Sequence, residues 1–186
     1  MEKHGPVMIK PIIRSATAAD LPRCLSFDPS FETEYVWQMD NRLQEGQINV
    51  SFRTVRLPRP MKVTYPRDTR QLNAGWDACD AMLVADDNRA VVGYAALAKR
   101  RAQSTVWVQD LIISKPARRQ GVGSALLTGV VRWAREEKLA WIMIEVQTKN
   151  YPAIQFCQKH GFTFCGYNDH FFANQDIAVF FVKAVH

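Results

Sequence analysis

The stretch at residues 118–127 decides the fold of this chain, and it runs Arg118-Arg119-Gln120-Gly121-Val122-Gly123-Ser124-Ala125-Leu126-Leu127. The glycines at positions 121 and 123 let the backbone come close to an anion, because they carry no side chain. The apolar spacing that follows them predicts a helix, whose N-terminus adds partial positive charge at the same place. The stretch therefore predicts a loop that binds a phosphate through its backbone N–H groups.

The spacing excludes two other phosphate-binding loops. A dinucleotide-binding fingerprint needs a third glycine where this chain has Leu126. It also needs an acidic residue about twenty positions further on at the end of a following strand, and none stands there. A P-loop ends in Gly-Lys-Ser or Gly-Lys-Thr, which is also absent. A basic surface turn that contains two glycines by chance is the alternative for this stretch alone, so the surrounding sequence has to decide.

Length and composition predict a single domain over residues 1–186, with 47% hydrophobic residues to build its core. No apolar run reaches the roughly eighteen residues of a membrane span, and the N-terminus lacks a signal-peptide core, so we expect a cytoplasmic protein. The four cysteines contain no Cys-x-x-Cys pair, and the four histidines have no metal-ligand spacing. We therefore expect reduced thiols and no metal.

The net charge of +6 is concentrated in two basic segments, residues 53–70 and 99–119. The second segment brackets the predicted phosphate loop. The first has few interleaved aromatic residues, and a solvated charged face is its simpler interpretation. We expect no nucleic acid and no membrane among the partners.

The elements around the loop are well marked in the sequence. Thr17 to Asp20 resembles a capping box and predicts a helix start. From residue 81 onward we expect a hairpin, a strand, a helix, a strand, a helix and two further strands, over the following ranges: 81–85 and 91–98, 105–113, 122–138, 141–146, 150–161, 162–167 and 177–185. A short strand is also expected at residues 9–13.

Residues 30–70 are less regular. We expect a helical piece around Tyr35, Trp37 and Met39, followed by an alternating strand at residues 48–52. The prolines at positions 58 and 60 can continue neither a helix nor a central strand. We expect this segment, about residues 30–75, to be the variable region on the acceptor side of the domain.

A strand ending at residues 111–113, four residues, and then Arg-x-x-Gly-x-Gly at 118–123 resemble the signature of the GNAT superfamily of N-acetyltransferases. A second block agrees at the right distance, namely Glu145-Val-Gln-x-x-Asn150-x-x-Ala153-Ile-x-Phe156, ending in Gly161-Phe162. The resemblance covers about residues 81–182. It implies an α/β (α+β) GNAT fold, in which a mixed, mostly antiparallel, twisted sheet is flanked by helices and two strands splay apart.

The resemblance also implies the cosubstrate, acetyl-coenzyme A, and the residues that bind it. Its pyrophosphate is expected on the backbone of the loop, and its pantetheine arm along the strand edge and against Asn150. Ala153 and Phe156 belong to the same block. The implied binding set is Leu111, Ile112, Ile113, Arg118, Arg119, Gln120, Gly121, Val122, Gly123, Ser124, Asn150, Ala153 and Phe156.

Glu145 matches the position that, in several members of the superfamily, deprotonates the acceptor's ammonium group. An ammonium group with a pKa of about 10.4 has no lone pair for attack until it loses its proton. A strand-end carboxylate paired with a lysine is the structural alternative. Asp110, with Gln109 beside it, is the second choice for binding the acceptor.

Many members carry a tyrosine one position after Phe156 that protonates the departing thiolate, and this chain has Cys157 there. Because a thiol has a pKa of about 8.5, the thiolate can leave with only weak protonation. Cys157, Tyr151 or Tyr167 could supply the proton. An ordinary buried thiol is the alternative reading of Cys157.

The run from Glu145 to Ala153 is most similar to streptothricin acetyltransferases, so we expect transfer of an acetyl group to a primary amine of a small molecule. Two alternatives stay open. One is a protein N-terminal or lysine acetyltransferase, and the other is a catalytically degenerate acetyl-coenzyme A sensor or nucleic-acid-binding module. The sequence is compatible with a monomer and with a homodimer.

Overall fold

The computed structural model describes residues 10–67 and 79–185. By their contacts, these residues divide into two compact units. The first comprises residues 10–29, 79–145 and 182–185, and the second comprises residues 30–67 and 146–181. The expectation of a single domain stays a prediction, and each unit is described by itself.

The first unit holds the strands β1 (Ile12–Ser15), β4 (Ala81–Asp86), β5 (Val91–Arg100) and β6 (Thr105–Ile113), in the order β1-β4-β5-β6. Each pairs with its neighbour antiparallel. Strand β7 (Trp141–Gln147) continues this order beside β6 and is parallel to it. The expected mixed, mostly antiparallel sheet is therefore confirmed, as are the hairpin and the strand after it.

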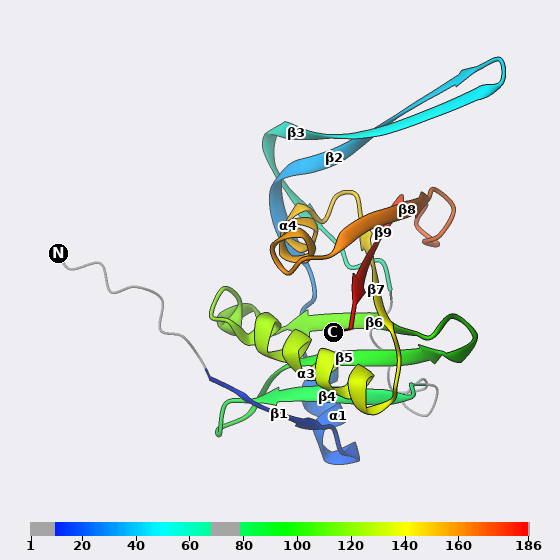
Figure 1. The fold of residues 1–186 in the computed structure, drawn as a ribbon. Helices are drawn as coiled ribbons and strands as arrows, with labels where there is room; N and C mark the ends of the chain where they lie inside the picture. Colours follow the sequence, from blue (N-terminus) through cyan, green and yellow to red (C-terminus); the bar gives the residue numbers. More distant parts are fainter. Residues whose placement is uncertain (1–9, 68–78, 186) are drawn as a thin grey trace. The chain divides into compact units, whose positions relative to one another are not determined.

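Helices lie on both faces of these strands (Figure 1). Helix α3 (Val122–Glu136) buries Leu126, Val130 and Ala134 against β4, β5 and β6. A Cβ atom added to Gly93 of β5 would lie 3.3 Å from Leu126, so Gly93 faces α3. Its neighbour Tyr94 therefore points to the other face, where its ring stacks on Phe27 just after the short helix α1 (Leu21–Leu25).

The expected capping box is present, and it caps a 3-10 turn (Ala18–Asp20) that leads directly into α1. The Asp20 carboxylate accepts hydrogen bonds from the backbone N–H of Thr17 at 2.8 Å and from its hydroxyl at 2.9 Å. Arg14 of β1 donates to the same carboxylate at 2.8 Å and holds its pKa well below the usual range. The cap therefore ties the helix to the edge of the sheet.

The ladder between β6 and β7 is short. It runs from Thr105–Trp141 to Val108–Ile144, whereas β6 continues to Ile113. The two strands thus separate in the last part of β6, as the expected splay requires. Within the ladder between β5 and β6, Ala96 pairs with Asp110 and Leu97 with Val108, so Gln109 forms a β-bulge.

The second unit contains a long hairpin of β2 (Phe31–Gln44) and β3 (Gln47–Val63), helix α4 (Tyr151–Lys159), β8 (Thr163–Asn168) and the start of β9 (Ala178–Ala184). The expected helix around Tyr35, Trp37 and Met39 is wrong, because these residues lie in β2. Their spacing of two places all three on one face of a strand.

The prolines fall inside β3, where the pairing with β2 is interrupted. Tyr35 pairs with Arg56 and Thr33 with Met61. Residues 57–60 of β3 therefore lie opposite the single residue Glu34 of β2, and they have no pairing partners in the ladder. A strand of a two-stranded sheet tolerates proline at such an interruption, because no ladder hydrogen bond is lost there.

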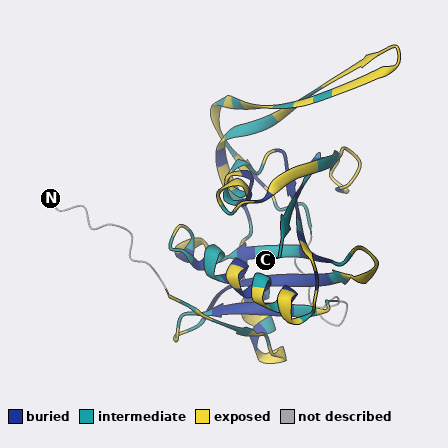
Figure 2. Ribbon diagram, viewed as in Figure 1, coloured by how far each residue is buried: buried dark blue, intermediate teal, exposed yellow. Residues whose placement is uncertain are grey.

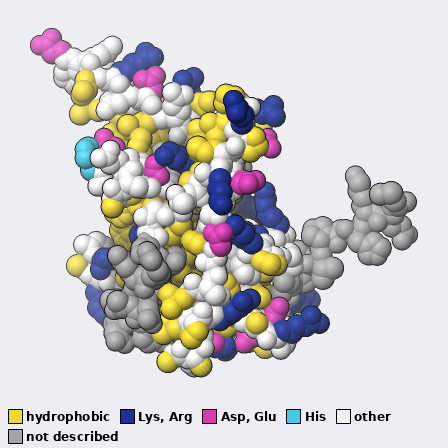
Figure 3. Space-filling view, turned by 180° about the vertical axis from the view of Figure 1, so that it is seen from behind, with side chains coloured by type: hydrophobic (Ala, Val, Ile, Leu, Met, Phe, Trp, Pro, Cys, Tyr) yellow, Lys and Arg dark blue, Asp and Glu magenta, His cyan; other side chains and the backbone are white. Residues whose placement is uncertain are grey.

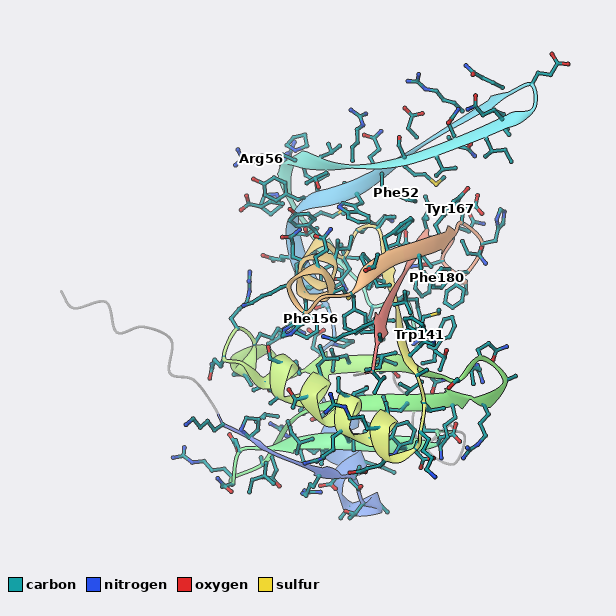
Figure 4. The ribbon with its side chains drawn as sticks, in the orientation of Figure 1. Phe52, Arg56, Trp141, Phe156, Tyr167 and Phe180 are labelled. Carbon is teal, nitrogen blue, oxygen red and sulfur yellow. The ribbon has the colours of Figure 1, made fainter. Side chains whose placement is uncertain are left out.

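An aromatic cluster forms the core of the second unit. The ring of Trp37 lies 5.9 Å from Phe52, 6.2 Å from Phe164 and 5.9 Å from Phe181. Phe52 of β3 also points toward Tyr167 of β8, with the ring centroids 5.6 Å apart (Figure 4). The base of the hairpin is thereby packed on β8 and β9.

Candidate active site

The predicted phosphate loop lies between β6 and α3 in the first unit. A 3-10 turn at Lys115–Ala117 follows β6, and α3 begins at Val122. Gly121 precedes the helix with a φ of +87°, a left-handed conformation that side chains disfavour. The first-turn N–H groups of α3 have no acceptors inside the helix, so the loop offers backbone donors, as anion-binding helix N-termini do.

Arg118 holds the loop from the inside. Its Nε donates to the carbonyl oxygen of Ile113 at 3.0 Å and its NH2 group to that of Asp28 at 2.9 Å. Burial lowers the pKa of its guanidinium. Lys115 adds an ion pair to the Asp28 carboxylate at 2.5 Å. The side chain of Arg118 thus fixes the geometry of the loop.

Arg119 and Gln120 differ from Arg118 in their surroundings. Arg119 is exposed, with a φ of +64°, and among residues 10–67 and 79–185 its guanidinium has no partner. Gln120 donates from Nε2 to the carbonyl oxygen of Pro116 at 2.6 Å. The exposed positive charge at the loop therefore comes from Arg119.

The strand edge expected to bind an extended ligand is the last part of β6. Leu111, Ile112 and Ile113 pair with Ala95, Tyr94 and Gly93 of β5 on one side. On the other side the β7 ladder has already ended at Val108. An extended chain can add to such an edge through backbone hydrogen bonds.

Glu145 is buried at the point where β6 and β7 separate, with 9% of its surface exposed. The indole Nε1 of Trp107 in β6 donates a hydrogen bond to its Oε2 atom. A hydrogen bond from an N–H group favours the ionised form of a carboxylate and fixes its orientation. Glu145 is thus a buried carboxylate that the indole of Trp107 orients.

The bulge at Gln109 decides where Asp110 points. Without it, the alternation along β6 would put Asp110 on the same face as Val108. With it, Asp110 lies opposite Ala96, on the face that carries Trp107, which pairs with Ala98. The bulge therefore brings the second predicted carboxylate onto the face of Glu145.

Asn150 caps helix α4 in the second unit. Its Oδ1 accepts from the N–H of Ala153 at 3.1 Å, so the cap uses the oxygen of the amide and not its nitrogen. Tyr151 contacts Tyr35 of β2 with ring centroids 5.3 Å apart, and Phe156 contacts His160 at 4.4 Å. The structure thus carries the predicted residues of this unit on one short helix.

Cys157 is buried in α4 with 1% of its surface exposed. Burial raises the pKa of its thiol to about 12. A thiol this weakly acidic is a poor proton donor to a thiolate whose conjugate acid has a pKa of about 8.5. The structure therefore favours the interpretation of Cys157 as a buried core residue.

Within residues 10–67 and 79–185, no group of three or more His, Cys, Asp or Glu side chains is arranged to hold a metal ion. His4, His186 and Arg70 of the basic segment lie outside the described residues. No described helix is both long and apolar enough to cross a membrane.

The profile of the acetyltransferase (GNAT) family matches residues 51–162. The chain belongs to the GNAT family. It is an acetyl-CoA-dependent N-acetyltransferase. Streptothricin acetyltransferase of Streptomyces lavendulae is 28% identical to this GNAT chain over 163 residues, which are 82% of each protein. Streptothricin acetyltransferase A of Bacillus subtilis strain 168 is 32% identical over 77 residues, covering 39% of this chain and 44% of the relative.

Solved structures agree on the GNAT fold. A nourseothricin acetyltransferase superposes with a TM-score of 0.80 at 22% identity, over 94% of this chain and 98% of that one. A Bacillus anthracis protein assigned provisionally as a streptothricin acetyltransferase, solved in complex with acetyl coenzyme A, gives 0.75 at 20% identity, over 94% and 99%. At these identities the likeness establishes the fold.

Trp107 is the site residue that the sequence did not reveal. Its role depends on the register of the parallel β6–β7 pair, which sets Trp107 opposite Met143, two positions before Glu145. If both strands are assigned, the sequence can suggest a contact between a tryptophan and a glutamate on the same face of adjacent strands. The register that brings these two residues together is known only from the fold.

Proposed function

We propose that this GNAT enzyme transfers the acetyl group of acetyl-CoA to a primary amine of a small molecule of the streptothricin kind. The observation that carries the proposal is the buried Glu145 carboxylate, oriented by Trp107 where β6 leaves β7. The extended similarity to streptothricin acetyltransferase of Streptomyces lavendulae supports the acceptor class.

The loop from Arg118 to Ser124 would hold the pyrophosphate of acetyl-CoA. The residues fit this group, because Gly121 adopts a positive φ and the first turn of α3 offers backbone N–H groups. Arg119 would add a charge, while Arg118 keeps the loop in shape. Leu111, Ile112 and Ile113 would pair with the pantetheine arm, and Asn150 would donate to it, with Ala153 and Phe156 alongside. Acetyl-CoA supplies an activated thioester, so the chain needs no further cofactor for the transfer.

Glu145 would accept the proton of the acceptor's ammonium group, directly or through one water. The neutral amine then attacks the thioester carbonyl carbon and a C–N bond forms. The nitrogen gives up its second proton to solvent or to the leaving sulfur, and the C–S bond breaks to release coenzyme A. Such proton transfer contributes about 10²- to 10⁴-fold in rate. Asp110, on the same face, would help bind the cationic acceptor.

The departing thiolate would leave with little protonation from the protein. Of the predicted donors, Cys157 is weakened by its raised pKa of about 12. Tyr151 remains the proposed donor on α4, because its phenol lies on the first turn of that helix. The donor contributes modestly, since a thiolate is already a good leaving group at neutral pH.

The test is release of free thiol from acetyl-CoA with a panel of acceptors. We expect turnover with streptothricin and with small primary amines such as lysine derivatives, and at most weak turnover with peptides that offer an N-terminal or lysine amine. Faster turnover with the peptides would favour a protein acetyltransferase. Tight binding of acetyl-CoA with no turnover on any amine would refute the proposal.

A further inference from the structure

The β2–β3 hairpin has one apolar face and one polar face along its outer half. The register pairs Met39 with Phe52, Asn41 with Val50, and Leu43 with Ile48, all on one face. The other face carries the pairs Gln38–Arg53, Asp40–Ser51, Arg42–Asn49 and Gln44–Gln47. We call the first face, from Met39 to Leu43 and from Ile48 to Phe52, the hairpin strip.

Among residues 10–67 and 79–185, the aromatic contacts to the strip are at its inner end. There Phe52 packs against Phe164 with ring centroids 5.5 Å apart, within the aromatic core. At the outer end Leu43 is 76% exposed and its partner Ile48 is 71% exposed (Figure 2). A two-stranded hairpin is only marginally stable in water without such cover. Contact with another surface would therefore stabilise the outer half of the hairpin.

The charges of the hairpin indicate what kind of partner fits. The strip itself contains no charged residue, and over residues 38–53 Asp40 and Glu45 offset Arg42 and Arg53, in a chain whose net charge is +6. The view from behind shows both charge signs and apolar side chains on the outer hairpin (Figure 3). A neutral surface of this kind offers nothing to a phosphate or an anionic membrane, whereas an uncharged apolar surface complements it.

Asn41 indicates that the uncharged surface opposite the strip is the strip of a second copy. It is the one polar residue among the three pairs of the strip, and it lies in the middle pair. Buried against a foreign apolar surface, its amide would lose its hydrogen bonds to water. Across a two-fold axis it would meet a second Asn41, and two amides can each donate to and accept from the other.

We propose that the hairpin strip is the interface of a homodimer, in which two copies pack their strips face to face around an axis near Asn41. About five side chains per copy, each covering on the order of 100 Å², would remove roughly 1,000 Å² from water, the lower bound for a specific interface. The polar faces of both hairpins stay in solvent.

Sedimentation velocity of the full chain tests the proposal, from about 0.1 to 100 µM. We expect a concentration-dependent dimer for the wild type. Leu43→Lys should weaken it at least 100-fold, because it places a charge in the strip. Gln44→Lys, which introduces the same residue one position along on the polar face, should leave the dimer unchanged.

A second pair of variants tests the two-fold axis. Asn41→Asp places two carboxylates against each other and should weaken the dimer at pH 8 more than at pH 4.5, whereas Asn49→Asp on the polar face should not. Far-UV circular dichroism checks that all variants fold. A wild type that stays monomeric, including one that binds neutral lipid vesicles instead, would overturn the proposal. So would a dimer that survives both Leu43→Lys and Asn41→Asp.

Discussion

Trp107→Phe removes the indole N–H that donates to Glu145 and leaves an aromatic ring in its place. A hydrogen bond to a charged group contributes about 1.5 to 3 kcal/mol, and each 1.36 kcal/mol is a factor of about ten in rate. If Glu145 is the base, kcat/KM for the amine should fall about 10- to 150-fold at neutral pH. The carboxylate also loses a donor that favours its ionised form, so the acidic limb of the pH–rate profile should move to higher pH, by about one unit per 1.36 kcal/mol.

The assay is thiol release from acetyl-CoA between pH 5 and 10, with the KM for acetyl-CoA measured alongside. Trp141→Phe is the matched control, because Trp141 lies at the start of β7, four positions before Glu145, and is 44% exposed. It should reproduce the wild-type profile. If folded Trp107→Phe enzyme matched wild type within about two-fold, with an unmoved acidic limb, the reasoning about Glu145 would be refuted.

Three further predictions concern the loop, the thiol and the cap. Arg119→Ala should raise the KM for acetyl-CoA about five-fold with little change in kcat, whereas Arg118→Ala should lower the melting temperature, because Arg118 holds the loop; equal effects of both would contradict these roles. Cys157→Ala should keep kcat within about three-fold, and a 100-fold loss in a folded variant would make Cys157 the acid. Asp20→Asn should cost about 2 kcal/mol of unfolding free energy at pH 7 by denaturant titration. Because Arg14 lowers the pKa of Asp20 in the folded protein, this stabilisation is present above about pH 4 and is lost as the pH falls toward that lowered pKa. The difference in unfolding free energy between variant and wild type should therefore shrink on acidification. A difference that stays constant down to about pH 2 would contradict this role of Asp20.

Local signals in the sequence predicted the elements that depend on local chemistry. The capping box at Thr17 and Asp20 was predicted because it joins residues three apart, and the structure shows it. The Asn150 cap of α4 also joins residues three apart, but it was not among the predictions. The strand at residues 105–113 was predicted with its bounds, since β-branched residues fill it and a turn follows. The expected helix around Trp37 failed because a period of two was taken for a helical pattern.

The site was only partly predictable. The resemblance supplied Glu145 and the loop, but the orientation of Glu145 depends on Trp107 across a parallel strand pair. The role of Arg118 also depends on Asp28, which is 90 positions away in the sequence. Register and long-range contacts of this kind are set by packing of the whole sheet, which no local pattern encodes.

Glu145→Gln, measured for both catalysis and binding, tests whether Glu145 is the base. We expect kcat/KM for the amine to fall about 10²- to 10⁴-fold, while the Kd of acetyl-CoA by calorimetry stays within about two-fold. The defect should shrink toward pH 10, where the acceptor amine loses its proton without help. An equal loss in catalysis and in acetyl-CoA binding, or a defect that does not depend on pH, would contradict the account.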